Sequence, residues 1–106
     1  MSMPPPALSA PLNIRSPARE RIYRTLLADP KALWTVAGLA QRLPGVSADA
    51  VRTTLYLLHR DHVLEPVTGQ RRLTYQLGDD GAGALRAVLN RWRGKGRPPL
   101  ATEESD

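Results

Sequence analysis

The sequence contains no cysteine and no phenylalanine among its 106 residues. Without cysteine, neither a disulfide framework nor a thiolate metal site is possible. No stretch approaches the roughly 18 consecutive apolar residues of a membrane-spanning helix, and the N-terminus lacks a basic start followed by an apolar run. We therefore expect a cytoplasmic protein with no membrane partner, whose core is built from leucine, valine, tryptophan and tyrosine.

The motifs of the common enzyme classes are also missing. The chain has no glycine-rich phosphate loop, no nucleophile elbow and no constellation of serine, histidine and acid. His59 and His62 lie three residues apart, but no cysteine or suitably spaced acid completes a metal site around them. We expect no enzyme activity, no metal, no cofactor and no small-molecule effector.

The two ends of the chain differ in composition from its middle. Residues 1–15 contain Pro4-Pro5-Pro6 and show little periodicity, and residues 94–106 are rich in glycine, proline and acids. Both segments are typical of disordered tails. The remaining residues, 16–93, are predicted to form one domain, near the size at which a small core is marginal and a partner subunit often helps.

Basic side chains outnumber acidic ones, giving a net charge of +5. Such an excess attracts polyanions, although it also serves solubility alone. Arginine accounts for 13 of the 15 basic residues. Its planar fork suits bidentate contacts with phosphate and guanine, but a bias towards arginine can equally reflect a GC-rich genome.

Two helices are predicted in the first half of the domain. Ser16-Pro17 is a helix-start signal before the apolar stripe of Ile22, Tyr23, Leu26 and Leu27, and Asp29-Pro30 ends that helix. Leu33-Trp34 is expected to be extended. Thr35 then caps a second helix, in which Val36, Leu39, Ala40 and Leu43 follow helical spacing up to Pro44-Gly45.

A third helix is predicted over residues 47–61, capped by Ser47. Its core face consists of Val51, Leu55, Leu58 and His62, whereas Asp49, Thr53, Tyr56 and Arg60 point outward with Arg52 on the flank. The turn of about four residues before this helix gives helix-turn-helix spacing. A purely structural helical hairpin, with an ordinary solvated face, remains the alternative.

A hairpin and a last helix follow. Residues 63–68 and 71–77 are predicted to pair around a two-residue turn at Gly69-Gln70. Leu64 then lies opposite Tyr75 and Pro66 opposite Leu73, so these apolar residues share one face of the hairpin. Arg71 and Arg72 then lie at the hairpin tip, where they are candidates for binding. The alternative is that this tip is only a solvated basic turn. The last helix begins at Asp79 or Asp80, and glycines 81 and 83 weaken its first turn. Its apolar stripe either closes the core of the monomer or meets a second subunit: Ala82, Leu85, Val88, Leu89 and Trp92.

This order of elements resembles a winged helix-turn-helix domain over residues 17–92. Residues 34–43 are similar to the supporting helix, and residues 46–64 to the recognition helix that leads into the wing. Residues 71–77 with 79–81 are similar to the wing and following helix of MarR-like and PadR-like regulators. The resemblance implies an α+β fold, mainly helical, with a three-helix core, a small β-hairpin and a C-terminal helix. The chain departs from the pattern at His62, where glycine is common, and it lacks the long additional helices of MarR-type dimers.

The resemblance implies sequence-specific binding to double-stranded DNA, with helix 47–61 in the major groove and wing 63–77 on the backbone or minor groove. Asp49 is expected to support the helix start or orient Arg52 rather than touch DNA, since its charge repels phosphate. The expected DNA-binding residues are Ser47, Ala48, Asp49, Arg52, Thr53, Tyr56, Arg60, Arg71 and Arg72.

The function implied is that of a small prokaryotic transcriptional regulator, such as a repressor, associated with the nucleoid. A winged-helix protein-interaction module and a plasmid replication or partition protein remain alternatives. Because one recognition helix contacts few base pairs, we expect a homodimer on a two-fold-related site. The expected dimerisation residues are Leu85, Val88, Leu89 and Trp92.

Overall fold

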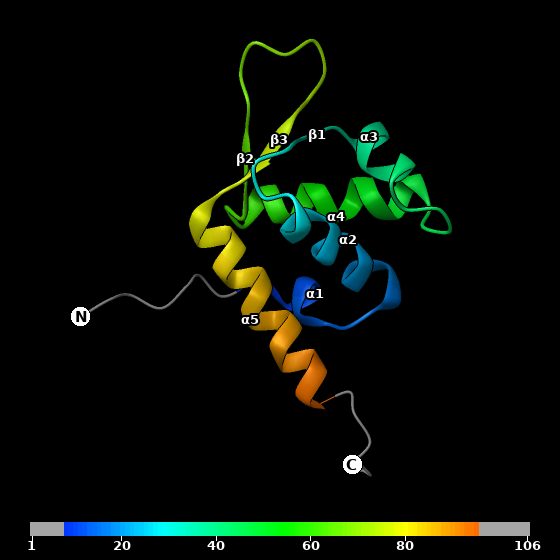
Figure 1. Cartoon of the computed structure of the whole chain (residues 1–106), viewed down its shortest axis with the longest axis vertical. Helices are drawn as coiled ribbons and strands as arrows, with labels where there is room; N and C mark the ends of the chain where they lie inside the picture. The colour runs from blue at the N-terminus through cyan, green and yellow to red at the C-terminus, as the bar shows by residue number, and fades with distance from the viewer. Residues whose placement is uncertain (1–7, 96–106) are drawn as a thin grey trace, which may run out of the picture.

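The computed structural model describes residues 8–95, which form a mixed α+β fold (Figure 1). Within this range there are five helices and one three-stranded antiparallel sheet. The elements are α1 (Ala10–Asn13), α2 (Pro17–Ala28), β1 (Leu33–Trp34), α3 (Val36–Gln41), α4 (Ala48–Arg60), β2 (Leu64–Pro66), β3 (Tyr75–Leu77) and α5 (Asp79–Lys95). From α2 onward, their order is the order that the sequence predicts.

Three helices begin at the caps that the sequence indicates. The side chains of Ser16, Thr35 and Ser47 each accept a hydrogen bond from the backbone N–H three residues further along, at 3.0, 3.0 and 3.1 Å. Each bond satisfies a donor that has no partner within the first helical turn, which typically contributes about 1 kcal/mol. The starts of α2, α3 and α4 are therefore set by local sequence.

The core lies where α2, α4 and α5 meet the sheet, and every helix contributes to it. Its largest fully buried side chains are Tyr23, Leu12, Ile22, Leu26, Leu39, Leu55, Leu58, Leu64, Leu85, Val51, Val63 and Val88. Because this set spans Leu12 to Val88, the domain closes by contacts between segments that are distant in the sequence.

The domain extends further towards the N-terminus than the sequence predicts. Leu8 and Leu12, both within the expected tail of residues 1–15, are buried in the core. The hydroxyl of Tyr23 donates to the carbonyl of Leu12 at 2.9 Å, and the Ser9 N–H donates to a carboxylate oxygen of Asp61 at 2.7 Å. Helix α1 has only four residues, which is too short to produce a helical pattern of apolar residues in a proline-rich segment. No sequence pattern therefore indicates that this segment joins the domain. The rest of the two expected tails, residues 1–7 and 96–106, lies outside the described residues.

The hairpin register differs from the predicted one by two residues. Leu64 pairs with Leu77 and Pro66 pairs with Tyr75, where the sequence had placed Leu64 opposite Tyr75. The reason is that the loop is longer than two residues. The last hydrogen bond between the strands joins the Val67 N–H to the Thr74 carbonyl at 2.9 Å, and residues 68–73 form the loop beyond it. A shift of two residues keeps the alternation of side chains, so Leu64 and Tyr75 still face the core, whereas Pro66 and Leu73 are exposed.

Strand β1 makes the hairpin part of a larger sheet. The strand order is β1-β3-β2, and Trp34 of β1 pairs with Tyr75 of β3. Strand β3 is therefore central and β2 is an edge. Pro66 lies on that edge, where its missing N–H removes no bond from the ladder.

Helix α4 ends in a Schellman motif centred on His62. The Val63 N–H donates to the Leu58 carbonyl at 2.9 Å, and the His62 N–H donates to the His59 carbonyl at 3.0 Å. His62 has φ of 65°, the left-handed conformation that usually requires glycine. The prediction that His62 belongs to the core face is therefore wrong: the chain turns at this residue, and its side chain is exposed.

Replacing His62 with glycine is expected to raise the free energy of unfolding by about 1 kcal/mol. Glycine removes the contact between Cβ and the following carbonyl oxygen, which outweighs its greater entropy in the unfolded chain. Urea unfolding followed by circular dichroism measures the change. His62→Ala is the matched control, because it keeps Cβ and is expected to give no gain. Equal stabilities for the glycine and alanine variants would contradict this account.

The apolar stripe of α5 packs inside the monomer. Leu85, Val88, Leu89 and Trp92 are all buried within the single chain. The Trp92 ring stacks on Tyr23 of α2, with centroids 5.4 Å apart, and its indole N–H donates to the Asn13 carbonyl at 2.9 Å. On the single chain these four side chains are therefore not exposed, and the homodimer stays a prediction. Of the two possibilities that the sequence left open, the stripe closes the core of the monomer.

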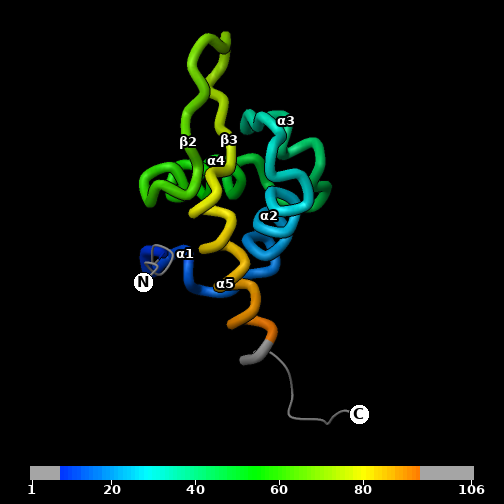
Figure 2. The backbone as a smooth tube through the Cα atoms, turned by 60° about the vertical axis from the view of Figure 1, so that its left-hand side comes forward, coloured from blue at the N-terminus to red at the C-terminus, as the bar shows by residue number. Residues whose placement is uncertain are grey.

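Figures 1 and 2 show how these elements are arranged in space. The β2–β3 loop projects at one end of the molecule, beyond the helices, and α5 leads away from the sheet towards the opposite end. Helix α4 crosses between them and connects directly to β2. The two arginines of the loop and the last turn of α5 thus lie far apart.

Candidate nucleic-acid interface

A tight connection brings α4 into contact with α3. The Val46 N–H donates to the Leu43 carbonyl at 3.0 Å, and Gly45 has φ of 89°, a conformation that a side chain would strain. Behind this turn, Val51, Leu55 and Leu58 bury one face of α4 in the core. The opposite face is held towards solvent by that packing.

All nine residues predicted to bind DNA are exposed. Seven of them belong to α4 or to its cap: Ser47, Ala48, Asp49, Arg52, Thr53, Tyr56 and Arg60. Tyr56 is notable among them, because this large aromatic residue is 58% exposed to solvent. We call these seven residues the outer face of α4.

Asp49 and Arg52 form an ion pair on the outer face of α4. An η nitrogen of Arg52 donates to a carboxylate oxygen of Asp49 at 2.6 Å, with side-chain exposures of 62% and 90% respectively. A pair this exposed contributes little to stability. It does restrict where the guanidinium group points, and it leaves the remaining N–H donors of Arg52 available. This geometry agrees with the expectation that Asp49 orients Arg52.

The other two predicted residues, Arg71 and Arg72, lie in the β2–β3 loop. The Thr74 hydroxyl, which is buried, donates to the Arg72 carbonyl at 2.9 Å and so anchors one side of the loop. Leu73 is 64% exposed, although the sequence placed it on the apolar face of the hairpin. That placement is wrong because Leu73 lies in the loop, beyond the last pair of the ladder.

A groove that the sequence does not indicate borders the outer face of α4. It has a volume of about 400 Å³ and lies between the first turn of α2, including Ser16 and Arg19, and the first turns of α4, including Asp49 and Thr53. These two segments are separated by some thirty positions in the chain. Periodicity within one helix carries no information about such a pairing, so only the folded arrangement shows it.

Residues 8–95 lack two further features, a metal-binding cluster and a helix that could span a membrane. That part of the chain has no group of three histidine, cysteine, aspartate or glutamate residues that could hold a metal ion. None of its helices has the length and apolar character needed to span a lipid bilayer. His59 lies against the ring of Tyr75, with centroids 5.4 Å apart, which gives it a packing role.

Neither a protein-family model nor a curated protein sequence matches this chain. The exposed residues of α4 and of the β2–β3 loop are the features of the described chain that bear on its function.

Proposed function

We propose that the protein binds double-stranded DNA in a sequence-specific manner, as a small winged helix-turn-helix protein. The observation that carries this proposal is the outer face of α4, which places Arg52, Thr53, Tyr56 and Arg60 in solvent while the opposite face is buried. Arginine can form bidentate contacts with guanine, and threonine and tyrosine supply further polar and apolar contacts. Helix α4 is the reading element, placed in the major groove.

The position of the β2–β3 loop supports the same proposal. It follows α4 after a short connection and carries Arg71 and Arg72, both exposed. In the order helix, strand, helix, turn, helix, hairpin, helix, this loop corresponds to the wing. Its arginines are proposed to contact the phosphate backbone or the minor groove beside the site of α4.

Within this proposal, we favour transcriptional regulation as the biological role. The decisive experiment selects bound fragments from the source genome and maps them, because promoters, replication origins and partition sites differ in position and repetition. Binding to one sequence that resists competition by random duplex, with a steep salt dependence, is the expected result. Weak binding that is equal for all duplexes would favour a protein-interaction module instead.

Replacing Arg52 with alanine is expected to cost about 1–3 kcal/mol in binding to the preferred site and to relax discrimination at one base pair. A bidentate base contact is lost, while binding to random duplex changes little. Fluorescence anisotropy on the preferred site and on single-base variants measures both effects. Arg91→Ala is the control for loss of charge, because Arg91 lies on α5 and contacts Asn13. Equal weakening on every sequence would contradict a base-reading role.

Replacing both Arg71 and Arg72 with alanine is expected to weaken binding to every duplex. The slope of log K against log salt should become shallower by about one to two units, as expected when one or two phosphate contacts are lost. Titrations at several salt concentrations, on the preferred site and on random duplex, provide the measurement. An unchanged slope would mean that the loop does not touch DNA, and Arg91→Ala again controls for net charge.

A further inference from the structure

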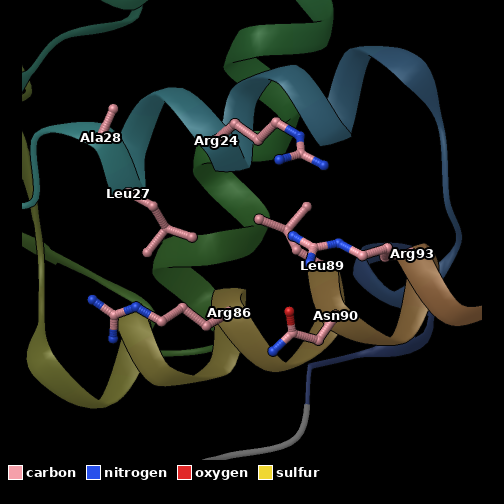
Figure 3. A pocket seen from close by; sticks show the side chains of 7 residues that line it. All are labelled: Arg24, Leu27, Ala28, Arg86, Leu89, Asn90 and Arg93. Carbon is pink, nitrogen blue, oxygen red and sulfur yellow. The ribbon is translucent and has the colours of Figure 1, made fainter.

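Helices α2 and α5 pack side by side but leave an open groove between them, with a volume of about 370 Å³ (Figure 3). Leu27 of α2 and Leu89 of α5 form its apolar floor. Its polar lining consists of Arg24 of α2 with Arg86, Asn90 and Arg93 of α5. The outer face of α4 does not contribute to this groove, so the DNA-binding proposal leaves it unexplained.

The groove carries more positive charge than its surroundings neutralise. Arg24 is paired with Glu20, at 2.9 Å between nitrogen and carboxylate oxygen, and Glu20 is shared with Arg15. Arg86 and Arg93 have no carboxylate within 4.0 Å among the described residues. Two guanidinium groups therefore line the α5 side of the groove with no acidic partner from residues 8–95.

The three polar residues of α5 form a regular stripe. Arg86, Asn90 and Arg93 are spaced i, i+4 and i+7, so they lie on one side of the helix, facing α2. The two arginines are about 10 Å apart along the helix axis, at about 1.5 Å per residue. An extended peptide placed along the stripe would need acidic side chains over a similar length.

We propose that the acidic stretch Glu103-Glu104-Ser105-Asp106 of the same chain occupies this groove. In an extended conformation, positions 103 and 106 are about 10 Å apart, which matches the separation of Arg86 and Arg93. The three carboxylates would pair with the guanidinium groups, and Asn90 would donate its side-chain amide to the peptide. No other run of the sequence brings three acids within four residues.

The length of the connecting chain allows this contact. Helix α5 ends at Lys95, two residues after Arg93, and the connecting residues 96–102 span up to about 25 Å when extended. A connection of this length allows the chain to turn back along α5 and place residues 103–106 in the groove. The arginines of the β2–β3 loop lie at the other end of the molecule (Figures 1 and 2). Because the contact is intramolecular, an effective concentration in the millimolar range allows even weak ion pairs to form.

A spin label on the full-length chain tests this proposal without DNA. The sequence has no cysteine, so Ser105→Cys gives a single labelling site that keeps all three acids. We expect the oxidised label to broaden the backbone amide signals of Leu27 and Ala28 on α2, and of Arg86 on α5, relative to the reduced sample. The α2 signals are decisive, because tethering alone brings the label near the last turn of α5. Raising the salt to about 1 M should remove the broadening, since the Debye length is then about 3 Å.

Two matched variants separate docking from nonspecific attraction. Arg86→Gln with Arg93→Gln should abolish the broadening at Leu27 and Ala28. Arg91→Gln, which changes charge on the same helix but contacts Asn13 outside the groove, should leave the broadening in place. Unchanged amide signals elsewhere in the spectrum show that each variant is folded.

Three outcomes would overturn the proposal. The first is the absence of broadening on α2. The second is broadening on the outer face of α4 or on the β2–β3 loop in place of the groove. The third comes from mixing isotope-labelled chains that lack the spin label with spin-labelled chains that lack the isotope. Broadening that persists undiminished in this mixture would mean that the tail of a second copy occupies the groove.

Discussion

Replacing Gly81 with alanine is expected to lower the free energy of unfolding by about 2–3 kcal/mol. A Cβ atom at this position would overlap the carbonyl oxygen of Val63 and lie 2.8 Å from its Cα. The Val63 peptide cannot move aside freely, because its carbonyl accepts a bond from the Gly78 N–H at 3.3 Å and its side chain is buried. The first turn of α5 therefore approaches the backbone after α4 more closely than any side chain allows.

The sign of this change distinguishes close packing from helix propensity. Propensity alone predicts that alanine at position 81 stabilises the helix by about 1 kcal/mol, the opposite of the expected result. Gly83→Ala is the matched control, since Gly83 lies in the same stretch of α5 and is only half-buried. Urea unfolding of both variants, followed by circular dichroism, gives the comparison. A gain in stability for Gly81→Ala would show that the two backbones do not meet as described.

Gly81 also shows a limit of reading the sequence alone. The sequence shows that Gly81 weakens the first turn of α5. It does not show that the backbone of Val63, 18 positions away, approaches too closely for a side chain at this position. By contrast, the caps at Ser16, Thr35 and Ser47 are local, because donor and acceptor are separated by three residues. Features that depend on a few neighbouring residues could be predicted, whereas those that depend on a distant partner could not.

The hairpin lies between these two cases. The alternation of side chains is local, and it correctly places Leu64 and Tyr75 in the core. The register depends on the length of the loop, and Gly69-Gln70 suits a two-residue turn equally well as the start of a longer one. The structure has the longer loop, so Leu73 lies in solvent. Its side chain loses the cross-strand partner that the shorter turn would have provided.

The same distinction applies to the candidate site. The exposure of Arg52, Thr53, Tyr56 and Arg60 follows from helical periodicity, and the structure confirms it. The groove beside α2 and the arginine groove between α2 and α5 each need two segments brought together, so neither could be found in the sequence. What the outer face of α4 binds depends on a partner and stays a prediction.

Replacing Trp92 with alanine is expected to lower the free energy of unfolding by about 3–5 kcal/mol, the usual range for truncating a buried aromatic side chain. The substitution removes the stacking on Tyr23 and leaves a cavity between α2 and α5. It also removes the indole N–H that donates to the Asn13 carbonyl and so connects α5 to the end of α1. Since small domains have a total stability of about 5–15 kcal/mol, this loss is a large part of the total.

Trp92→Phe separates the two contributions. Phenylalanine keeps an aromatic ring against Tyr23 but has no N–H, so its expected cost is only about 1–2 kcal/mol, the value for one lost hydrogen bond and its unpaired acceptor. The phenol of Tyr23, whose pKa is raised above its ordinary value by burial, donates to the Leu12 carbonyl in the unmodified protein. Urea unfolding of the alanine and phenylalanine variants therefore compares ring removal with loss of the indole N–H.

The same variants test whether α5 belongs to the core of the monomer or to a dimer. A dimer surface at Trp92 would make the stability of the unmodified protein depend on concentration, and Trp92→Ala would release folded monomers with half the mass. Burial of Trp92 within one chain instead predicts a stability that is independent of concentration and a loss on substitution at every concentration. Sedimentation equilibrium together with urea unfolding at two protein concentrations distinguishes the two results, and folded, half-mass Trp92→Ala would contradict the packing of α5 against Tyr23.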